Sequence, residues 1–428
     1  MTNEIIKVVR GFRDVYSNTD IKLLESFRIA ISNITNQYGI NELRTPILEK
    51  AELFNRSIGV TTEIVNKEMY VFEDRNGDAL SLRPEGTASC VRSALENNLI
   101  FDRGIKRKKY WYFGPMFRRE RPQKGRFRQF DQFGIEYFGF DNINSDLEII
   151  FFGNRLFNDE LKIDGTKLHI NSIGNEEDRL IYGKKIKDLL DKYKKELTED
   201  QQNTLDRNPI RILDNKSEKI KKILEDLPKL TDMLSTDSKK RFESLVQKLD
   251  QSNTKYIIDN SIVRGLDYYN DTVFEWKHDS LGSQDAICAG GRYDGLVKKI
   301  GGVEVPAIGF AAGVDRILMI LSELNQTNLQ SSSVAIINHS AENSYEALAK
   351  TEDLRNQFKQ ISFYSTDSSS NIDKQYKQAE QIKPKYILFF GDDEIKSNTY
   401  TIKGLKDKVK KEQISKTELA KILDNINK

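Results

Sequence analysis

Apolar residues recur at three- and four-residue spacing along residues 20–38 (DIKLLESFRIAISNITNQY), a pattern that predicts an amphipathic helix. Gly39 follows as a typical C-terminal stop. Residues 69–86 predict a hairpin, because two extended runs flank the turn-forming dipeptide Asn-Gly. Residues 110–117 and 129–138 are rich in aromatic side chains and suit two antiparallel strands joined by a charged loop. The N-terminal part of the chain therefore mixes helix with strand.

The composition changes between residues 171 and 250, where lysine-rich sequence has helical periodicity and strand signals nearly vanish. Glycine-rich, strand-like sequence then returns. After a polar break, strands and helices alternate to the last residue, as in a small α/β domain. The sequence thus predicts an α+β core made of residues 1–170 and 251–326, a helical insertion at 171–250 and an α/β domain at 331–428.

Length and composition indicate a folded protein of two or three domains. The chain has 428 residues, of which 38% are hydrophobic and 31% charged, and disordered or fibrous proteins do not have such a composition. The 67 basic residues nearly cancel the 65 acidic ones, which leaves a net charge of +2. A nucleic-acid partner therefore cannot be inferred from total charge and would have to rest on local patches.

Cysteine and histidine residues give no sign of a disulfide framework or a metal site. Cys90 and Cys288 are far apart and show no paired spacing, which favours a reducing cytoplasm. His169, His278 and His339 are isolated in strand-like surroundings, so we expect no metal there. The N-terminus lacks the apolar core of a signal peptide, and no apolar run is long enough to span a bilayer. We therefore expect no membrane association.

The first segment with candidate chemistry is residues 82–87 (LRPEGT), which precede a helical stretch. In one interpretation it is a strand–turn–helix corner, with Thr87 as the helix cap and Glu85 near the positive helix end. In the other, Glu85 and Thr87 accept hydrogen bonds from the ammonium group of a ligand. The two interpretations are compatible, and the sequence does not separate them.

The second segment, residues 117–130 (FRRERPQKGRFRQF), contains five arginines and one lysine. Guanidinium groups bind phosphate oxygens in pairs and neutralise negative charge, so the run suits a polyphosphate. A solvated hairpin tip is the ordinary explanation of such a charged loop. The aromatic residues on both sides favour the phosphate site, because they predict a buried sheet that leads into the loop.

Three further glycine-rich segments are ambiguous when each is taken alone. Residues 263–269 (VRGLDYY) and 289–294 (AGGRYD) predict either tight turns or the wall of a polar pocket. Residues 308–316 (IGFAAGVDR) lead from a strand into a helix, where small residues usually mean close backbone packing. In the functional interpretation, Arg316 points from this segment into an ATP site. The order and spacing of all these segments are far more specific than any one of them.

Taken in order, the segments resemble class II aminoacyl-tRNA synthetases and, within that class, histidyl-tRNA synthetase. Motif one resembles residues 40–49, motif two residues 117–136 and motif three residues 309–316, and the two histidine-specific signatures resemble residues 264–269 and 289–294. The resemblance begins with the sequence GFRD near the N-terminus and covers nearly the whole chain. Two small departures are Arg119, where histidine is frequent, and Asp315, where glutamate is usual.

The resemblance implies an α+β fold, in which an antiparallel-sheet catalytic domain with a helical insertion is followed by a C-terminal α/β anticodon-binding domain. It implies a histidine–tRNA ligase, which joins L-histidine to ATP as histidyl-adenylate and releases pyrophosphate. The enzyme then transfers the histidyl group to the 3′ end of tRNA(His). ATP would be a substrate that binds together with Mg²⁺. The resemblance also implies a homodimer in the cytoplasm.

Residue roles follow from the positions that match the family motifs. Arg118 and Arg264 would be catalytic, because both could neutralise charge on the α-phosphate in the transition state. The expected ATP-binding residues are Arg118, Glu120, Arg126, Phe130 and Arg316. The expected histidine-binding residues are Glu85, Gly86, Thr87, Arg118, Gln132, Glu136, Arg264, Tyr268, Tyr269 and Tyr293. An exposed cross-strand position is the ordinary alternative for Glu136, and the resemblance favours the pocket.

The resemblance also implies where tRNA binds, and it leaves two rival functions. The loop at residues 123–126 and lysines of the C-terminal domain would meet the tRNA; these lysines are Lys383, Lys385, Lys403, Lys406 and Lys408. The main alternative is a synthetase-like regulatory subunit of ATP phosphoribosyltransferase, which typically lacks the C-terminal domain and parts of the ATP motifs. Another is a nucleic-acid-binding or signalling protein derived from a synthetase, which would have no reason to keep all three arginines at 118, 264 and 316.

Overall fold

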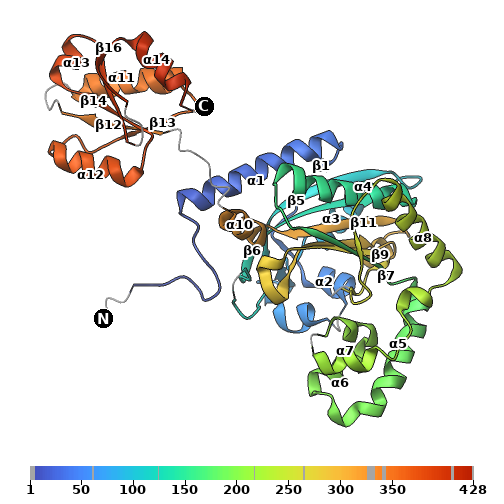
Figure 1. The fold of residues 1–428 in the computed structure, drawn as a ribbon. Helices are drawn as coiled ribbons and strands as arrows, with labels where there is room; N and C mark the ends of the chain where they lie inside the picture. The colour runs from blue at the N-terminus through green and yellow to red at the C-terminus, as the bar shows by residue number, and fades with distance from the viewer. Residues whose placement is uncertain are drawn as a thin grey trace. The chain divides into compact units, whose positions relative to one another are not determined.

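The structure is a computed structural model that describes residues 5–59, 62–123, 125–215, 217–263, 266–324, 333–339, 344–405 and 409–426. Of residues 18, 283, 284 and 344 it describes the backbone alone. The chain forms two compact units, Met1–Asn325 and Gln326–Lys428, of which the second is drawn in orange and red in Figure 1.

The first unit confirms the helix, the hairpin and the aromatic strands that the N-terminal pattern predicts. Its strands are β1 (Asn41–Glu42), β2 (Leu48–Lys50), β3 (Tyr70–Glu73), β4 (Ala79–Leu82), β5 (Lys108–Phe117), β6 (Gln129–Phe138), β7 (Lys167–Ser172), β8 (Ile257–Ile258), β9 (Asn270–Lys277), β10 (Ala286–Arg292) and β11 (Ala307–Gly313). Its α-helices are α1 (Asn18–Gln37), α2 (Ala51–Ile58), α3 (Thr87–Glu96), α4 (Ile143–Asn154), α5 (Glu176–Leu190), α6 (Glu199–Arg207), α7 (Glu218–Leu224), α8 (Thr236–Gln251), α9 (Leu296–Ile300) and α10 (Val314–Glu323). A short helical turn, η4 (Pro209–Asp214), lies between α6 and α7.

One large sheet organises the first unit. Its eight strands lie in the order β1-β5-β6-β11-β10-β9-β7-β8. The inner pairs are antiparallel, whereas the two-residue strands β1 and β8 pair in parallel at the edges. The resemblance predicts an antiparallel sheet, and the structure confirms it (Figure 1).

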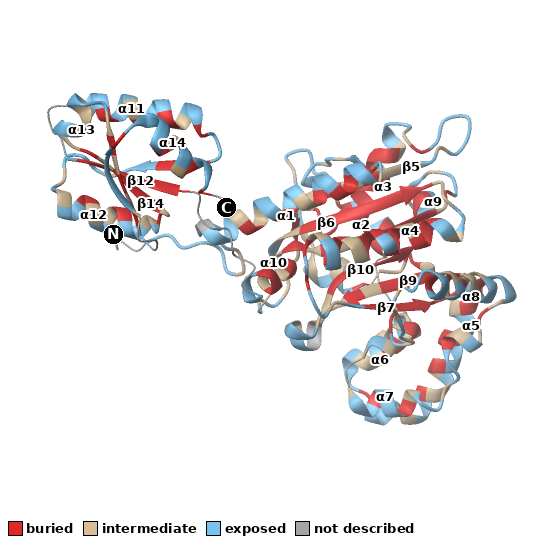
Figure 2. Ribbon diagram, turned by 45° about the horizontal axis from the view of Figure 1, so that its top comes forward, coloured by how far each residue is buried: buried red, intermediate tan, exposed pale blue. Residues whose placement is uncertain are grey.

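The two faces of this sheet differ because side chains alternate along each strand. On β6, Phe133 and Ile135 belong to a buried cluster that continues into α1, α4, α8 and α10. Figure 2 shows this core as red strands beside helices whose outer sides are pale blue. The other face carries Gln132, Gly134 and Glu136 of the same strand. On this second face, small and polar side chains thus lie between two large apolar ones, Phe130 and Phe138.

A separate three-stranded sheet of order β2-β4-β3 contains the predicted hairpin. Its turn includes Gly77 at φ +85°, a conformation that favours glycine, and the Asp74 carboxylate accepts two backbone N–H groups of the turn. Arg83 fixes the end of this sheet to the large one. Its guanidinium donates to the carbonyl oxygens of Pro115 and Thr45, each at 2.9 Å.

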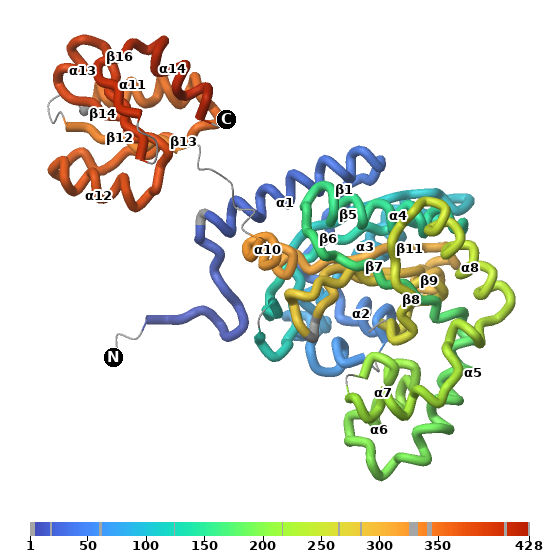
Figure 3. Tube along the Cα trace, in the orientation of Figure 1, coloured from blue at the N-terminus to red at the C-terminus, as the bar shows by residue number. Residues whose placement is uncertain are grey.

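Between α5 and α8 the described residues form helices and helical turns without a strand, in agreement with the helical pattern of residues 171–250. Residues 176–251 are called the helical segment below. Figure 3 shows the chain leaving the large sheet after β7 and returning through α8 to β8 and β9. Helix α8 packs against α4 and β9, and its Leu245 and Leu249 are buried with the sheet. The last helix of the segment therefore forms part of the sheet's own core.

The second unit confirms an α/β domain with more strands than the pattern predicts. Its elements are β12 (Ser333–Asn338), α11 (Ser344–Gln357), β13 (Ser362–Ser365), α12 (Ile372–Ile382), β14 (Tyr386–Phe390), α13 (Asp392–Lys396), β15 (Tyr400–Gly404), β16 (Lys410–Ile414) and α14 (Lys416–Asp424). They form a sheet of order β13-β12-β14-β15-β16, with β12 parallel to both neighbours. The antiparallel strands β15 and β16 follow one another without a helix and so depart from the expected alternation; lysines and other polar residues interrupt any apolar run there.

Two glycines let helix α3 begin directly against strand β5. An added Cβ at Gly86, the residue before α3, would lie 2.1 Å from the ring of Tyr112. At Gly134 on β6, it would lie 2.4 Å from the same ring. The Tyr112 hydroxyl in turn donates to Oε1 of Gln132 at 3.2 Å. A side chain at either glycine would therefore displace the tyrosine that supports the start of the helix.

We expect Gly86→Ala to lower the free energy of unfolding by about 2–3 kcal/mol, since overpacking forces side chains and backbone to shift. Gly295 is the matched control, because it also precedes a helix, with φ −80°, and no described atom lies within 4 Å of an added Cβ. Gly295→Ala should change the same quantity by less than about 0.5 kcal/mol. Urea denaturation measures both, and equal losses would contradict the close approach to Tyr112.

Candidate active site

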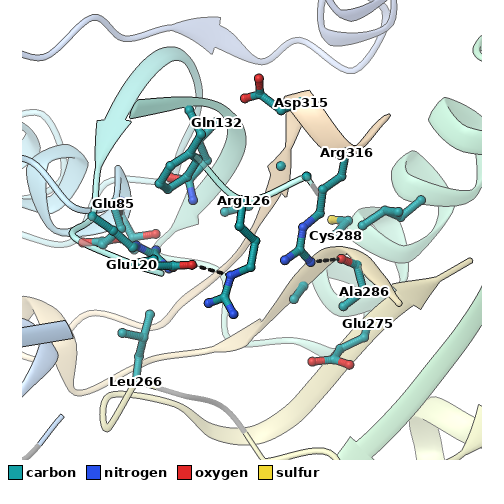
Figure 4. Close-up of a pocket in the computed structure, with 18 of the residues that line it drawn as sticks. Glu85, Glu120, Arg126, Gln132, Leu266, Glu275, Ala286, Cys288, Asp315 and Arg316 are labelled. Carbon is teal, nitrogen blue, oxygen red and sulfur yellow. Dashed lines mark hydrogen bonds and ion pairs between the residues drawn. The ribbon is translucent and has the colours of Figure 1, made fainter. Parts of the chain in front are cut away.

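A cavity of about 240 Å³ opens on the polar face of the large sheet (Figure 4). Its walls come from the start of α3, the loop between β5 and β6, the segment before β9, the strands themselves and the start of α10. The lining residues are Glu85, Thr87, Arg118, Glu120, Gly125, Arg126, Phe127, Phe130, Gln132, Leu266, Tyr268, Tyr269, Glu275, Ala286, Ile287, Cys288, Ala289, Ala311, Gly313, Asp315 and Arg316. Segments that the sequence singles out thus meet at one place.

Small side chains make room for this cavity above the sheet. Gly313 and Ala311 of β11 pair with Gln132 and Gly134 of β6, and Ala289 of β10 pairs with Ala311. A larger side chain at these positions would project into the cavity, because alternate residues of a strand share a face. The small residues of this segment therefore pack closely and also form the floor of the cavity, which Arg316 lines; that the cavity binds ATP stays a prediction.

Glu85 closes the N-terminus of α3. Its carboxylate accepts the backbone N–H groups of Thr87 at 2.7 Å and Ala88 at 2.8 Å, where the helix dipole favours negative charge. Burial nevertheless raises the pKa of Glu85 above its ordinary value. The expectation that Thr87 caps the helix is wrong, because Thr87 is the first helical residue, Gly86 is the N-cap residue and the Glu85 carboxylate accepts the N–H groups. The expectation that Glu85 lies at the positive helix end is confirmed.

Glu136 is buried behind Thr87. The Thr87 hydroxyl donates to Oε1 of Glu136 at 2.7 Å, and the Tyr293 hydroxyl donates to Oε2. The side chain of Glu136 is 0% exposed, so the alternative of an exposed cross-strand position is wrong. Burial raises the pKa of Glu136 to about 8, against the opposing effect of the two hydroxyl donors. The carboxyl group therefore carries a proton over much of the neutral range.

Three tyrosines form an aromatic cluster at this end of the cavity. The ring centres of Tyr268 and Tyr269 are 4.6 Å apart, and that of Tyr293 lies 5.6 Å from Tyr268 in an edge-on arrangement. Burial raises the pKa of Tyr268 and of Tyr293 well above their ordinary value, so both hydroxyls stay protonated donors. Tyr268 and Tyr269 line the cavity, while Tyr293 stands behind them against Glu136.

Arg118 is held at the junction between the acidic end of the cavity and its arginine-rich end. Its Nε donates to the carbonyl oxygen of Pro84 at 2.8 Å. Its guanidinium carbon lies 5.3 Å from the ring centre of Phe130. The guanidinium is thus held through its Nε, and Arg118 lines the cavity, an arrangement that suits an anionic ligand.

Two more arginines complete this end of the cavity (Figure 4). Arg126 forms an ion pair with Glu120, and Arg316 donates to the carbonyl oxygen of Ala286 at 2.7 Å. Burial lowers the pKa of Arg316, and the nearby charge of Arg126 lowers it further. Guanidinium groups that repel one another in this way favour a polyanion between them.

The N-terminal arm is bound to the same end. Nη2 of Arg13 lies 2.6 Å from Oδ1 of Asp315, and its guanidinium carbon lies 4.2 Å from the ring centre of Phe127. The other oxygen of Asp315 accepts the backbone N–H of Asp131 at 2.9 Å. Asp315 thus anchors the start of α10 directly before Arg316. Aspartate supplies a carboxylate at this position, as the glutamate that is usual there would.

The sequence and the fold of this chain have counterparts among known proteins. A family model described as Histidyl-tRNA synthetase matches residues 11–317, and one described as Anticodon binding domain matches residues 333–426. The chain belongs to the histidyl-tRNA synthetase family. Among solved structures, it is similar to the crystal structure of apo S. aureus histidyl-tRNA synthetase, with a TM-score of 0.77 and 29% identity over 99% of this chain and 100% of that one.

Curated relatives agree over nearly the full length. The chain is 44% identical to the histidine–tRNA ligase of Francisella tularensis subsp. tularensis (strain FSC 198). The alignment spans 423 residues and covers 98% of this chain and 99% of the relative. It is 42% identical to the histidine–tRNA ligase of Buchnera aphidicola subsp. Schizaphis graminum (strain Sg). This alignment spans 410 residues and covers 94% of each chain. Two family members thus share both units with this chain.

Most of the site residues that the sequence predicts for the family line the cavity; these are Glu85, Thr87, Arg118, Glu120, Arg126, Phe130, Gln132, Tyr268, Tyr269 and Arg316. Three predicted residues do not line it: Gly86, Glu136 and Tyr293. Gly86 and Glu136 are hydrogen-bonded to the lining residues Gln132 and Thr87, and Tyr293 is hydrogen-bonded to Glu136. Arg264 lies outside the described residues, as does Lys124 of the charged loop. The ligand contacts of all these residues stay predictions.

Glu275 lines the cavity although the sequence interpretation omitted it. On β9 it stands between Phe274 and Trp276, which are buried in the core on the opposite face. The sequence Phe-Glu-Trp was therefore an available signal, since alternation places the carboxylate on the site face. Ile287 and Cys288 also line the cavity, and their residue types carry no comparable signal.

No helix among the residues that the structure describes is long and apolar enough to cross a membrane. Within those residues, no group of three or more histidine, cysteine, aspartate or glutamate side chains is placed to hold a metal ion. Cys90 and Cys288 are both buried thiols.

The raised pKa of Glu136 predicts a pH-dependent stability. The folded chain keeps this proton up to about pH 8, whereas an unfolded glutamate loses it near pH ~4.3. The free energy of unfolding should therefore fall as pH rises through this window. Glu136→Gln keeps the shape and cannot ionise. Between about pH 5 and about pH 8, the free energy of unfolding of this variant should therefore fall less than that of the parent, by on the order of 3 kcal/mol. Urea denaturation measures both proteins, and identical pH profiles would mean that Glu136 titrates normally.

Proposed function

We propose that this cavity is where the chain activates L-histidine with ATP for transfer to tRNA(His). The chain is an ATP-dependent histidine–tRNA ligase, in keeping with its family and with histidine–tRNA ligases similar to it over nearly its full length. One observation carries the assignment of the site: carboxylates and hydroxyls meet three arginines within one cavity. A zwitterionic amino acid and a polyphosphate need such neighbours in a single place.

In the first step, a carboxylate oxygen of histidine attacks the α-phosphorus of ATP. A new P–O bond forms, the bond to the bridging oxygen breaks, and pyrophosphate leaves with that electron pair. Negative charge builds on the α-phosphoryl oxygens, and Arg118 and Arg264 would neutralise it. The anchored root of Arg118 on the cavity wall supports its role. The role of Arg264 rests on the family signature that contains it.

The adenine of ATP would stack between Phe130 and Arg316, and Arg316 would also reach the γ-phosphate. Glu120 would accept a hydrogen bond from the adenine amino group. Its present partners are Arg126 and, at 3.9 Å, Arg118, so ATP binding would replace ion pairs within the protein by contacts with the ligand. Arg126 would then turn to the phosphates, where its charge has a stronger partner.

We propose that Mg²⁺ binds with the ATP phosphates. This ion usually takes one or two carboxylates in addition to substrate phosphates and waters. Glu275 would be the carboxylate for that role, because it lines the cavity. The ion would then compete with Nζ of Lys277, which lies 3.6 Å from this carboxylate. When bound, the ion would offset negative charge on the phosphate oxygens.

The α-ammonium group of histidine would lie at the acidic end of the cavity. Glu85, Thr87 and Gln132 line it there and offer oxygen acceptors. Oε1 of Gln132 already accepts the backbone N–H of Gly86 at 3.0 Å, which orients the amide. Gly86 would thus contribute through its backbone, by fixing the acceptor that meets the ligand.

The imidazole ring would lie against Tyr268 and Tyr269, with Glu136 and Tyr293 behind them. The Glu136 carboxyl and the tyrosine hydroxyls would pair with the two ring nitrogens, and the ligand would replace one of the bonds that Glu136 now accepts from Thr87 and Tyr293. A site that pairs such groups rejects side chains that lack them by a factor of roughly 10⁴ or more, because polar groups would be left unpaired. This end of the cavity would therefore select histidine.

In the second step, the 3′-hydroxyl of the terminal tRNA adenosine attacks the carbonyl carbon of histidyl-adenylate, and AMP leaves. The loop at residues 123–126 would approach this acceptor end. The second unit, which matches the anticodon-binding model, would bind the anticodon. The functional domains would be residues 1–170 with 251–326, residues 171–250 and residues 331–428.

Lysines of the second unit would contact tRNA phosphates. Lys383 ends helix α12, Nζ of Lys385 donates to the carbonyl oxygen of Ile426 at 2.6 Å, and Lys403 lies over the ring of Tyr376. Lys406 and Lys408 lie outside the described residues.

The regulatory subunit of ATP phosphoribosyltransferase is the second candidate function. The anticodon-binding match over residues 333–426 and the arginines around the cavity disfavour it. Such a subunit binds histidine without activating it, so exchange of pyrophosphate into ATP separates the two functions.

We expect histidine-dependent exchange of labelled pyrophosphate into ATP by the full chain. Arg118→Ala should lower kcat/KM by ~10² to 10³, since one charge-stabilising donor is worth about that much in the transition state. Arg264→Ala should behave similarly. Arg121→Ala is the matched control, because this exposed arginine of the same loop does not line the cavity, and it should leave exchange unchanged. Absence of exchange in the parent protein would refute the site, and equal effects of all three variants would refute the roles of Arg118 and Arg264.

We also propose that the chain acts as a homodimer in the cytoplasm. Motif one includes the exposed apolar side chain of Leu48, and Phe72 is exposed on the same face of the small sheet, because their partners Leu82 and Leu80 lie two residues apart on β4. Apolar groups gathered on one surface favour burial against a second copy. The absence of paired cysteine spacing favours a reducing compartment.

Sedimentation analysis tests the dimer. Leu48→Asp should shift the protein toward the monomer, because it places a charge in the apolar contact. Ile29→Asp on α1 is the matched control, since Ile29 is also exposed but lies away from the small sheet. A monomeric parent protein, or equal effects of the two variants, would contradict the proposal.

A further inference from the structure

The loop that carries Tyr268 and Tyr269 has no helix or strand of its own. The described residues 266–269 form bends and turns just before β9. Neither a helix nor a strand ladder fixes such a backbone, so side-chain contacts have to hold it. Because both tyrosines line the cavity, those contacts set the shape of its amino-acid end.

The two tyrosine side chains also lie between two cavities. A second cavity, of about 670 Å³, lies between this loop and the helical segment, and Tyr268 and Tyr269 line both cavities. A side chain between two cavities shifts with less resistance than one in a close-packed core. The position of the tyrosines therefore depends strongly on how the loop is tied to its surroundings.

Asp267, directly before the tyrosines, ties the loop to the end of α2. Its backbone N–H donates to the carbonyl oxygen of Ile58 at 3.4 Å. Its Oδ2 approaches Gly59 so closely that an added Cβ there would lie 2.8 Å away. Gly59 also has φ +96°, a conformation that favours glycine. One side of Asp267 is thus held by the end of a helix.

The helical segment holds the other side of Asp267. Nδ2 of Asn208 and Nη2 of Arg211 both donate to Oδ1 of Asp267, each at 2.8 Å. Ile210 and Ile212, beside these donors on η4, are buried in the same apolar cluster as the two tyrosines. The donors therefore stand on an anchored turn. The Arg211 and Asp267 side chains are 18% and 24% exposed, so water screens their ion pair less than one on the surface.

We propose that Asn208 and Arg211 are positioning residues for histidine binding. They act through Asp267 to hold Tyr268 and Tyr269 at the amino-acid end of the cavity, and they do not touch the substrates. This inference rests on the proposed function, because it takes the ligand at that end to be the amino acid. It makes the helical segment part of the amino-acid site, although none of its described residues lines the cavity.

Pyrophosphate exchange by the full chain carrying Arg211→Met tests the proposal. We expect the KM for histidine to rise ~10-fold, since a displacement of about 1 Å in a binding group can cost up to ~10²-fold. The KM for ATP should stay unchanged. Lys187→Met is the matched control, because it removes one positive charge from the same helical segment and breaks an exposed ion pair with Asp206 at 3.0 Å. It should change neither KM.

A double-variant comparison separates action through Asp267 from a general loss of packing. If Arg211 works through Asp267, adding Arg211→Met to Asp267→Asn should raise the KM for histidine little further. Additive effects would contradict the route through Asp267. Asn208→Ala is a smaller change that should raise the same KM, and it keeps the test available if Arg211→Met fails to fold.

Hydrogen exchange gives a readout that does not need the activity. The backbone amides of Tyr268 and Tyr269 should exchange faster in Arg211→Met than in the parent protein or in Lys187→Met. Unchanged exchange of these amides would overturn the inference whatever the activity, and so would an equal rise in the KM for ATP. If the parent protein shows no histidine-dependent activity but the amides still exchange faster in Arg211→Met, the proposed function is overturned. The role of Arg211 in holding the loop through Asp267 would then still stand.

Discussion

The alternation of side chains across β6 and β11 is the constraint on which the core and the site both depend. Successive residues of a strand point to opposite faces, so Phe133 and Phe310 fill the core while Gly134 and Ala311 leave the other face open. The cavity lies where the site face of these strands carries small or polar side chains between larger ones such as Phe130 and Phe138. A slip of one residue in the register of either strand would exchange the two sets and place aromatic rings in the site.

Charge is divided along this cavity in a way that favours two ligands of opposite character. At one end, burial raises the pKa of Glu85 and of Glu136, and at the other, burial and Arg126 lower the pKa of Arg316. Each end therefore disfavours its own charged form when no partner is near. An ammonium group relieves the first end and a polyphosphate the second. The rest of the fold supports these poorly stabilised charges, as is common where a site is built for function at some cost in stability.

The sequence predicts the local elements of the site better than its long-range contacts. The strand at residues 129–138 follows from its aromatic pattern, and the structure confirms it without a shift. The burial of Glu136 depends on Thr87 and Tyr293, which lie 49 and 157 positions away along the chain, so no pattern within the strand shows it. The prediction that Thr87 caps α3 was wrong for another reason. Threonine is a frequent cap, but the turn brings the carboxylate of Glu85 within reach of the helix N–H groups first.

The helical segment shows the same limit for residues that carry no reactive chemistry. Its lysine-rich helices have the composition of an ordinary surface, and composition gives no reason to connect them with an amino-acid site. Besides apolar packing, the connection described above runs through the carboxylate of Asp267, whose partners Asn208 and Arg211 lie 59 and 56 positions away. A family signature identifies Asp267 together with Tyr268, but it does not name the groups that hold them. Supporting residues of this kind act through a neighbour, so only the three-dimensional arrangement can assign them to a site.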